Sequence, residues 1–312
     1  MINYDSKKWW EAISHFKTSY VIRRTMRMVF WMGGFASVVV ACDQFSKAYF
    51  DLNIFSLDVW VFSLLGVMLS LLMVFRLNSA YDRWWEGRKQ WGALINHTRG
   101  LAVLINGMMS KEDQGNRIFF ARGISAYVLS LSDHLRNISN HELVALYSDE
   151  SMESVKELAH VPNKIVNDLY ARIEQLYAAG VIDGFHLNQL KPETQSFLDI
   201  QGACERIKAT PIPFAHNFFI KLLIITYTGL VPFVLCSMFD SIVGPVLMTM
   251  LVAYALIGIE FISVEIEEPF GLDCNDLPTH NLAVKIQKNV HEILSVPLEG
   301  VEEEKGQYMV IN

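Results

Sequence analysis

Apolar runs about as long as a bilayer is thick constrain the fold of this chain more than any other feature. They form two pairs on either side of a long mixed region: Met28–Cys42, Leu52–Phe75, Phe214–Phe239 and Ile242–Ile259. A membrane-spanning helix needs about 20 predominantly apolar residues. The first run is shorter, but it can extend to Phe50 where Asp43 and Lys47 face protein or reach the membrane surface. The sequence therefore predicts four transmembrane helices.

The composition agrees with a membrane protein that carries a sizeable soluble part. Of the 312 residues, 52% are hydrophobic and 19% are charged, whereas charged residues make up about 25% of ordinary soluble domains. The formal net charge of −7 gives no support to nucleic-acid binding, which favours a basic surface. We therefore expect the lipid bilayer, and no nucleic acid, as a partner.

The mixed region between the two pairs of runs has a helical pattern. Its apolar residues recur three and four apart, and Pro162, Gly180 and Gly184 are expected to separate its helices. We therefore predict an all-α membrane protein. Its predicted parts are an interfacial or cytoplasmic N-terminal segment (1–27), two spans (28–75), a cytoplasmic helical domain (76–210), two more spans (211–260), and an acidic turn, helix and tail (261–312).

Basic residues beside the runs predict the orientation in the membrane. They lie before the first run, after the second and before the third: Arg23, Arg24, Arg27, Arg76, Arg83, Arg88, Lys89, Arg206, Lys208 and Lys221. The connection at 43–53 holds one lysine, and the turn at 240 holds none. Because lysine and arginine accumulate on the cytoplasmic side, we expect both termini and residues 76–210 to be cytoplasmic.

Three apolar side chains share one face of the second predicted span. Val67, Leu71 and Phe75 follow one another at intervals of four residues, which places them on one side of a helix. This stripe either packs on neighbouring helices or lines the narrow part of an ion pore. Apolar rings can gate a pore by dewetting, and with one such helix per subunit the pore requires a ring of subunits.

Carboxylates are dense immediately after the fourth run. Five lie within twelve residues, across a Pro-Phe-Gly turn: Glu265, Glu267, Glu268, Asp273 and Asp276. Carboxylates at this density can ligate a hard cation such as Ca²⁺, although the spacing is not that of an EF-hand loop. Alternatively, they form a solvated helix end or pair with the basic stretch at 83–99.

Motifs typical of catalysis are absent from the sequence, which holds no GxSxG, no Gly-rich phosphate loop and no HExxH. The nine histidines are dispersed without an obvious partner spacing, and we expect structural roles for them. We therefore expect that the chain is not an enzyme and requires no cofactor, with Ca²⁺ as the one candidate ligand.

Four separated segments carry a family signature. They are FSLLG at 62–66 leading to Phe75-Arg76, SAY at 79–81 leading to Trp91-Gly92, GACER at 202–206 leading to TPIPFA at 210–215, and EEPFG at 267–271 leading to NDLP at 275–278. In order and spacing they resemble the bestrophin family, specifically its bacterial members, over nearly the whole chain to about residue 295.

The resemblance implies a homopentameric ion channel of the bacterial inner membrane with one central pore. It also implies a neck of three rings, at Val67, Leu71 and Phe75, and a second, cytoplasmic aperture at Phe185. In animal members, a run of consecutive aspartates after Pro-Phe-Gly clasps calcium. The ends of that run correspond here to Asp273 and Asp276, so Ca²⁺ ligation by these residues and Glu268 is an expectation that the sequence leaves open.

The expected function is conduction of small monovalent anions, chloride above all, through the hydrophobic neck and the aperture. Animal members have a more aromatic neck and conduct chloride, whereas this neck is aliphatic at Val67 and Leu71. Conduction of sodium or potassium therefore stays open as an alternative. A second alternative, from another class, is a cytoplasmic binding or enzyme domain that the four spans merely anchor.

Overall fold

The computed structural model describes residues 19–50, 59–138, 158–239, 241–273 and 275–298. The described residues form helices and connections, without strands. The helices are α2 (Tyr20–Phe50), α3 (Val59–Met108), α4 (Gln114–Leu135), α7 (Val161–Ala178), α8 (Gly184–Ala209), α9 (Phe214–Leu235), α10 (Val243–Ile266) and α11 (Thr279–Leu294). Most of the expected N-terminal interfacial segment, part of the connection at 43–53 and the end of the C-terminal tail lie outside the described residues.

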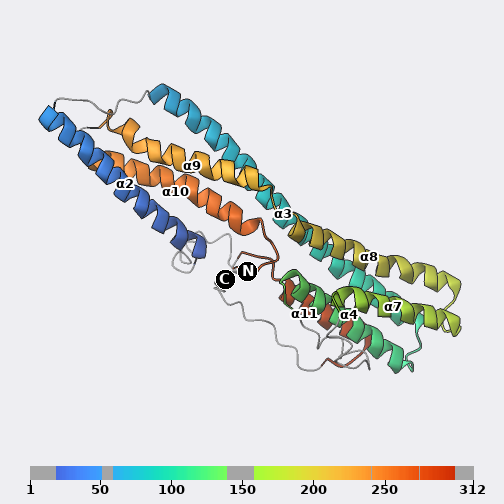
Figure 1. Cartoon of the computed structure of the whole chain (residues 1–312). Helices are drawn as coiled ribbons and strands as arrows, with labels where there is room; N and C mark the ends of the chain where they lie inside the picture. The colour runs from blue at the N-terminus through green and yellow to red at the C-terminus, as the bar shows by residue number, and fades with distance from the viewer. Residues whose placement is uncertain (1–18, 51–58, 139–157, 240, 274, 299–312) are drawn as a thin grey trace.

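The helices form two bundles that share α3 (Figure 1). We call α2, α9, α10 and the first half of α3 the span bundle, and α4, α7, α8, α11 and the second half of α3 the distal bundle. With 50 residues, α3 is about 75 Å long. The boundary expected between residues 75 and 76 lies inside this helix, so one rigid element connects the two bundles.

Four helices are long and apolar enough to cross a membrane: Val21–Phe50, Val59–Met108, Phe214–Leu235 and Val243–Ile266. The four predicted spans are thereby confirmed as helices, the second from Val59 onward because residues 52–58 lie outside the described part of the chain. The first continues to Phe50 because Asp43 is buried and pairs with Lys47 at 2.6 Å, and the Lys47 ammonium donates to the carbonyl of Cys236 at 3.1 Å. The charged pair therefore faces protein, as the extended span requires.

Proline and glycine set the ends of several helices. Pro213 lies directly before α9, and Pro162 occupies the first turn of α7, where a missing N–H costs no helical bond. Gly180, with a φ of +72°, follows the end of α7, in the left-handed conformation that favours glycine. Gly184 is the first residue of α8. Each of the three predicted breaks therefore coincides with a helix terminus.

The distal bundle contains the larger hydrophobic core. Trp91, Phe120, Tyr127 and Phe197 are all fully buried in it. The Tyr127 ring stacks on Phe197 at 5.0 Å between centroids, and its hydroxyl donates to the Phe197 carbonyl at 2.7 Å. This hydrogen bond satisfies a polar group in an apolar interior, and it ties α4 to α8.

A buried ion-pair network lies within the span bundle, close to its junction with the distal bundle. The guanidinium of Arg76, on α3, is fully buried and lies 2.5 Å from Oε2 of Glu267 and 3.4 Å from Oε2 of Glu260. The Lys221 ammonium approaches Glu260 from α9 at 3.9 Å. The fourth span was expected to end in acid after Ile259. The helix α10 continues past this point to Ile266, and Arg76 compensates the Glu260 carboxylate inside the helix packing.

Arg83, two turns further along α3, binds carbonyls rather than carboxylates. Its guanidinium donates to the carbonyls of Glu267, Thr210 and Ile207 at 2.9, 2.7 and 2.6 Å. Ile207 and Thr210 lie at the C-terminal end of α8, where carbonyls lack helical partners. The ion pairs with carboxylates are therefore made by Arg76, and Arg83 fixes the end of α8 against α3.

We expect Arg76→Met to destabilise the protein strongly. It would leave the buried Glu260 and Glu267 carboxylates without their main partner, a change that typically costs about 3–5 kcal/mol. Lys89→Met is the matched control, since it breaks the more exposed Lys89–Glu86 pair of the same helix, which is worth about 0–1 kcal/mol. Chemical unfolding of the purified variants in detergent measures both. Equal losses would contradict a special role for Arg76.

Candidate functional site

The predicted neck residues form an exposed stripe on the first half of α3. Val67 is 69% exposed, and Leu71 and Phe75 are each 57% exposed in the single chain. Ordinary soluble surfaces rarely gather large apolar side chains in such a continuous row. The stripe is therefore available to lipid or to another copy of the chain, and it does not pack inside the subunit.

The opposite face of α3 holds the helix in the span bundle. Leu69 and Met73 are buried against α9 and α10, and each lies about 200° around the helix from Leu71. The ring of Phe62 stacks on Tyr227 at 4.2 Å between centroids. A Cβ atom added to Gly66 would clash with the Tyr227 hydroxyl. Packing on one side thus directs the stripe away from the subunit.

The first half of α3 is also the least covered of the candidate spans. In its most apolar window 17% of the residues are buried, against 28–33% in the other three. Most of the apolar surface of this helix lacks a partner within the chain. A helix with this pattern needs contacts from outside the subunit on more than one side.

Polar side chains continue the stripe beyond Phe75. Asn78 and Asp82 follow at intervals of three and four residues on the same side of α3, and both are exposed. Any path along the stripe therefore changes from apolar to polar within about one turn of Phe75. Asp82 brings a negative charge to that side of the helix.

Phe185, the predicted aperture residue, lies at the far end of the distal bundle. It is the second residue of α8, whose N-cap Asp183 accepts a hydrogen bond from the backbone N–H of His186 at 2.8 Å. The Phe185 side chain is 68% exposed. Since α8 has 26 residues, Phe185 lies about 39 Å from the end that contacts Arg83.

The Pro-Phe-Gly turn after α10 packs directly on α3. Phe270 and Leu277 are buried, and a Cβ added to Gly87 of α3 would approach them at 3.1 and 3.3 Å. A larger residue at this position would require Phe270 or Leu277 to shift by a few tenths of an ångström. The acidic turn is thus attached to the same helix that carries the stripe.

The three predicted calcium ligands are not gathered around one point. Glu268 and Asp273 are exposed and line a cavity of about 180 Å³ together with Arg24, Glu265 and Glu267. Asp276 is buried and instead accepts a hydrogen bond from the backbone N–H of Asp273 at 2.7 Å. In the described part of the chain, the three carboxylates are not among the groups whose ligating atoms all lie within 4.8 Å of one another.

The surroundings of Asp276 disfavour its ionised form. Burial raises the pKa of this carboxyl from its ordinary value of 3.8 to about 8, and the hydrogen bond from Asp273 only partly opposes the shift. The negative charges of Asp273, Glu265 and Glu268 act in the same direction as burial. Its Oδ1 is buried without a hydrogen-bond partner among the described groups. The turn therefore holds oxygen donors suited to a hard cation, in an arrangement that requires Asp276 to rotate or lose a proton.

Sequence reasoning did not identify the partners of Arg76. In the sequence, Arg76 ends an apolar run and counts as a cytoplasmic charge. Glu260 and Glu267 follow the fourth apolar run. An arginine that ends one span and a glutamate that ends another are a signal for such a pair. Nothing in the sequence selects which of the many acids is the partner.

Comparison with known proteins identifies the relatives of this chain. A family model described as bacterial and fungal bestrophin protein matches residues 1–292. A voltage-dependent anion channel-forming protein of Nostoc sp. is 34% identical over 235 residues, which cover 74% of this chain and 76% of that protein. A protein of the same description from Synechocystis sp. is 30% identical over 288 residues, covering 86% and 90%.

Solved structures show the same fold. A mutated form of a bacterial bestrophin homologue from Klebsiella pneumoniae superposes with a TM-score of 0.77 at 23% identity, over 85% of this chain and 98% of that one. These matches confirm the resemblance and the all-helical membrane fold. The relatives named here are channel-forming proteins and not enzymes, as expected.

The raised pKa of Asp276 predicts a measurable pH dependence of stability. Between about pH 4 and pH 8 the folded chain keeps a proton that the unfolded chain has lost, so this group makes stability fall as the pH rises. Asp276→Asn removes the titrating group while keeping a similar shape. We therefore expect the stability advantage of the variant over the unmodified protein to grow from pH 4 to pH 8.

Thermal unfolding of the purified protein across this range, in the presence of a chelator, measures the difference. Asp199→Asn is the control, because Asp199 is exposed on α8. Parallel stability curves for the Asp276→Asn variant and the unmodified protein would show that Asp276 titrates normally.

Proposed function

Because this chain belongs to the bacterial and fungal bestrophin family, we propose that it is an anion channel of the bacterial inner membrane, assembled as a homopentamer around one pore. Relatives 34% and 30% identical are described as anion channel-forming proteins. Chloride is the permeant ion we propose. Both termini and the distal bundle then lie in the cytoplasm, as the distribution of lysine and arginine predicts.

The exposed stripe of α3 is the observation that carries this proposal. Val67, Leu71 and Phe75 point away from a helix whose opposite face is packed. Copies of α3 arranged around a symmetry axis turn these residues into three stacked apolar rings. Such rings exclude water when the pore is narrow, and a small widening admits water and ions. In this assembly the stripe is the neck and the gate.

Phe185 supports a second constriction along the same axis. Its exposed ring lies at the end of the distal bundle remote from the spans, as Figure 1 shows for the start of α8. A ring of phenyl groups has positive edges that can face a permeating anion. In the proposed pentamer, ions pass the neck, enter the space between the distal bundles and leave through this aperture.

Conduction of sodium or potassium is a second candidate function, and one observation favours it. The neck presents no basic side chain, while Asp82 lies on the stripe side of α3 beyond Phe75. In a pentamer, five such carboxylates would attract cations and repel anions. The sign of the permeant ion therefore depends on which side chains control the electric field in the pore, Asp82 or the two phenylalanines Phe75 and Phe185.

Calcium is the ligand that we propose for the acidic turn. Glu268 and Asp273 offer oxygen atoms at one cavity, and Asp276, three residues after Asp273, offers a buried carboxyl group. Because Phe270 of this turn packs on Gly87 of α3, a cation that reorganises the turn would act on the helix that carries the neck.

Planar-bilayer recording of the purified protein tests the channel proposal. We expect Leu71→Ala to raise conductance or open probability several-fold, because it shortens the side chains of the middle ring. Leu65→Ala is the matched control: it removes the same side chain from the same helix, about 120° away from Leu71. Equal effects of both substitutions would mean that Leu71 faces lipid.

The same recordings give the sign of the permeant ion. In a potassium chloride gradient, an anion channel reverses near the chloride equilibrium potential, and a cation channel reverses near that of potassium. Asp82→Asn should shift the reversal potential toward chloride if this carboxylate favours cations. Absence of current under all conditions would overturn the channel proposal.

Calcium control has its own test. We expect chelation of Ca²⁺ to change the current of the unmodified channel and to leave the Asp273→Asn, Asp276→Asn double variant unaffected. Glu112→Gln, in the turn before α4, provides a control for loss of an acid elsewhere. A current indifferent to chelation in the unmodified protein would remove the calcium proposal and leave the channel proposal intact.

A further inference from the structure

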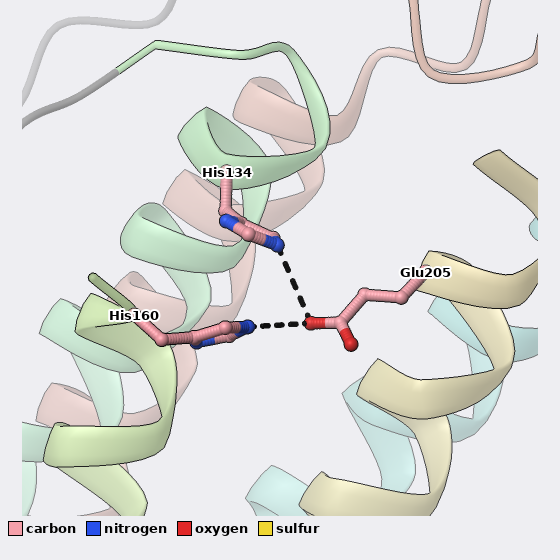
Figure 2. Close-up of side chains that lie close together, drawn as sticks. All are labelled: His134, His160 and Glu205. Carbon is pink, nitrogen blue, oxygen red and sulfur yellow. Dashed lines mark hydrogen bonds and ion pairs between the residues drawn. The ribbon is translucent and has the colours of Figure 1, made fainter. Parts of the chain in front are cut away.

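Three side chains with metal-ligating atoms meet in the distal bundle, away from the stripe and the acidic turn. His134 lies in the last turn of α4, His160 is the N-cap residue of α7, and Glu205 lies on α8. Figure 2 shows the three side chains pointing toward one another from these separate elements. Both Nε2 atoms contact the same oxygen, Oε1 of Glu205, at 2.9 Å from His160 and 3.4 Å from His134.

We propose that His134, His160 and Glu205 bind one divalent transition-metal ion of the zinc type. Two imidazoles and a carboxylate are a donor set that Zn²⁺, Co²⁺ and Ni²⁺ accept. Calcium and magnesium prefer oxygen ligands throughout, so this site is chemically distinct from the acidic turn. Three protein ligands leave a fourth tetrahedral position for water.

The observed separations fit a tetrahedral ion with little rearrangement. Metal–ligand bonds of about 2.0–2.2 Å place neighbouring ligand atoms about 3.3–3.6 Å apart. The two contacts to Glu205 are close to this length, and all three ligating atoms lie within 4.8 Å of one another. The imidazole rings lie 4.4 Å apart between centroids. Small side-chain rotations therefore suffice, without a change in the backbone.

A buried glutamine orients the carboxylate. Gln201, one turn before Glu205 on α8, is 3% exposed, and its Nε2 donates to Oε1 of Glu205 at 3.0 Å and to Oδ1 of Asn163 at 2.6 Å. Metal-binding carboxylates are usually held by such hydrogen bonds. The Gln201 Oε1 is buried without a hydrogen-bond partner among the described groups.

His134 is available in the form that binds metals. Burial and the neighbouring His160 lower the pKa of His134, which favours its neutral imidazole, while Glu205 acts in the opposite direction. A neutral imidazole binds a metal through its free nitrogen, with the proton on the other nitrogen. The carboxylate of Glu205 then supplies the negative charge of the site.

Two features oppose binding. Nδ1 of His160 accepts a long hydrogen bond, 3.4 Å, from the backbone N–H of Asn163, and a metal at Nε2 would place a proton on Nδ1 and break it. The ammonium of Lys208 also lies nearby, but it is engaged by the carbonyl of His134 at 2.9 Å and by the side chain of Asn137. Both features limit the affinity, and neither blocks access to the three ligating atoms.

Metal binding would fasten three helices beside the joint of the two bundles. Glu205 precedes Thr210 by five residues, and the Thr210 carbonyl accepts a hydrogen bond from Arg83 of α3. His134 lies in the last turn of α4, and His160 is the N-cap residue of α7. An ion that binds only the folded chain stabilises it, so the thermal midpoint should rise with metal concentration.

Titration of the purified full chain, without a histidine tag, tests the site with Zn²⁺ and Co²⁺ alone. We expect one tight Zn²⁺ per chain by calorimetry, a rise of the thermal midpoint with Zn²⁺, and the visible absorption of four-coordinate Co²⁺. A His134→Gln, His160→Gln double variant should bind at least tenfold more weakly and lose the thermal shift. Glutamine keeps a hydrogen-bond donor toward Glu205, so the fold is preserved.

His97→Gln is the matched control. His97 contacts Glu193 at 2.7 Å, which is a histidine–glutamate pair without a second histidine, and its substitution should leave Zn²⁺ binding unchanged. The Asp276→Asn variant controls in the same way for the acidic turn. The proposal is overturned if the unmodified protein gives no four-coordinate Co²⁺ spectrum, or if His97→Gln weakens binding as much as the double variant.

Discussion

The buried guanidinium of Arg76 between Glu260 and Glu267 is the interaction on which the rest of the structure depends. Removing three charged groups from water is costly, and only their mutual contact offsets that cost. The contact joins α3 to the end of α10 at the level where the apolar spans give way to the distal bundle. Arg83 adds hydrogen bonds to the end of α8. Together the two arginines determine how both bundles sit on one long helix.

In that arrangement, the two faces of α3 have different surroundings. One face packs on α9 and α10 through Leu69 and Met73, and further along it meets Phe270 at Gly87. The other presents Val67, Leu71 and Phe75 outward. Since a single helix carries both faces, the acidic turn and the stripe are attached to the same element. The histidine–glutamate cluster lies beside the same joint, on α4, α7 and α8.

Much of the fold could be predicted from local sequence. The third predicted span begins at the same residue as α9, because two prolines precede it. The helix predicted within residues 261–312 is α11. The helix of the fourth span continues beyond Ile259 to Ile266, with Glu260 paired to Arg76. Local pattern does not reveal this partner, because Arg76 lies far away in the sequence.

Hydrophobic length and basic flanks determined from the sequence alone that the chain spans a membrane with four helices. Helical spacing determined that Val67, Leu71 and Phe75 share a face. Those properties depend on residues near one another in the chain. Only the tertiary structure decided that this face points away from the subunit, that Asp276 is buried while Asp273 is exposed, and that His134, His160 and Glu205 converge. Burial and convergence depend on which distant elements pack together, and spacing along one helix does not encode that choice.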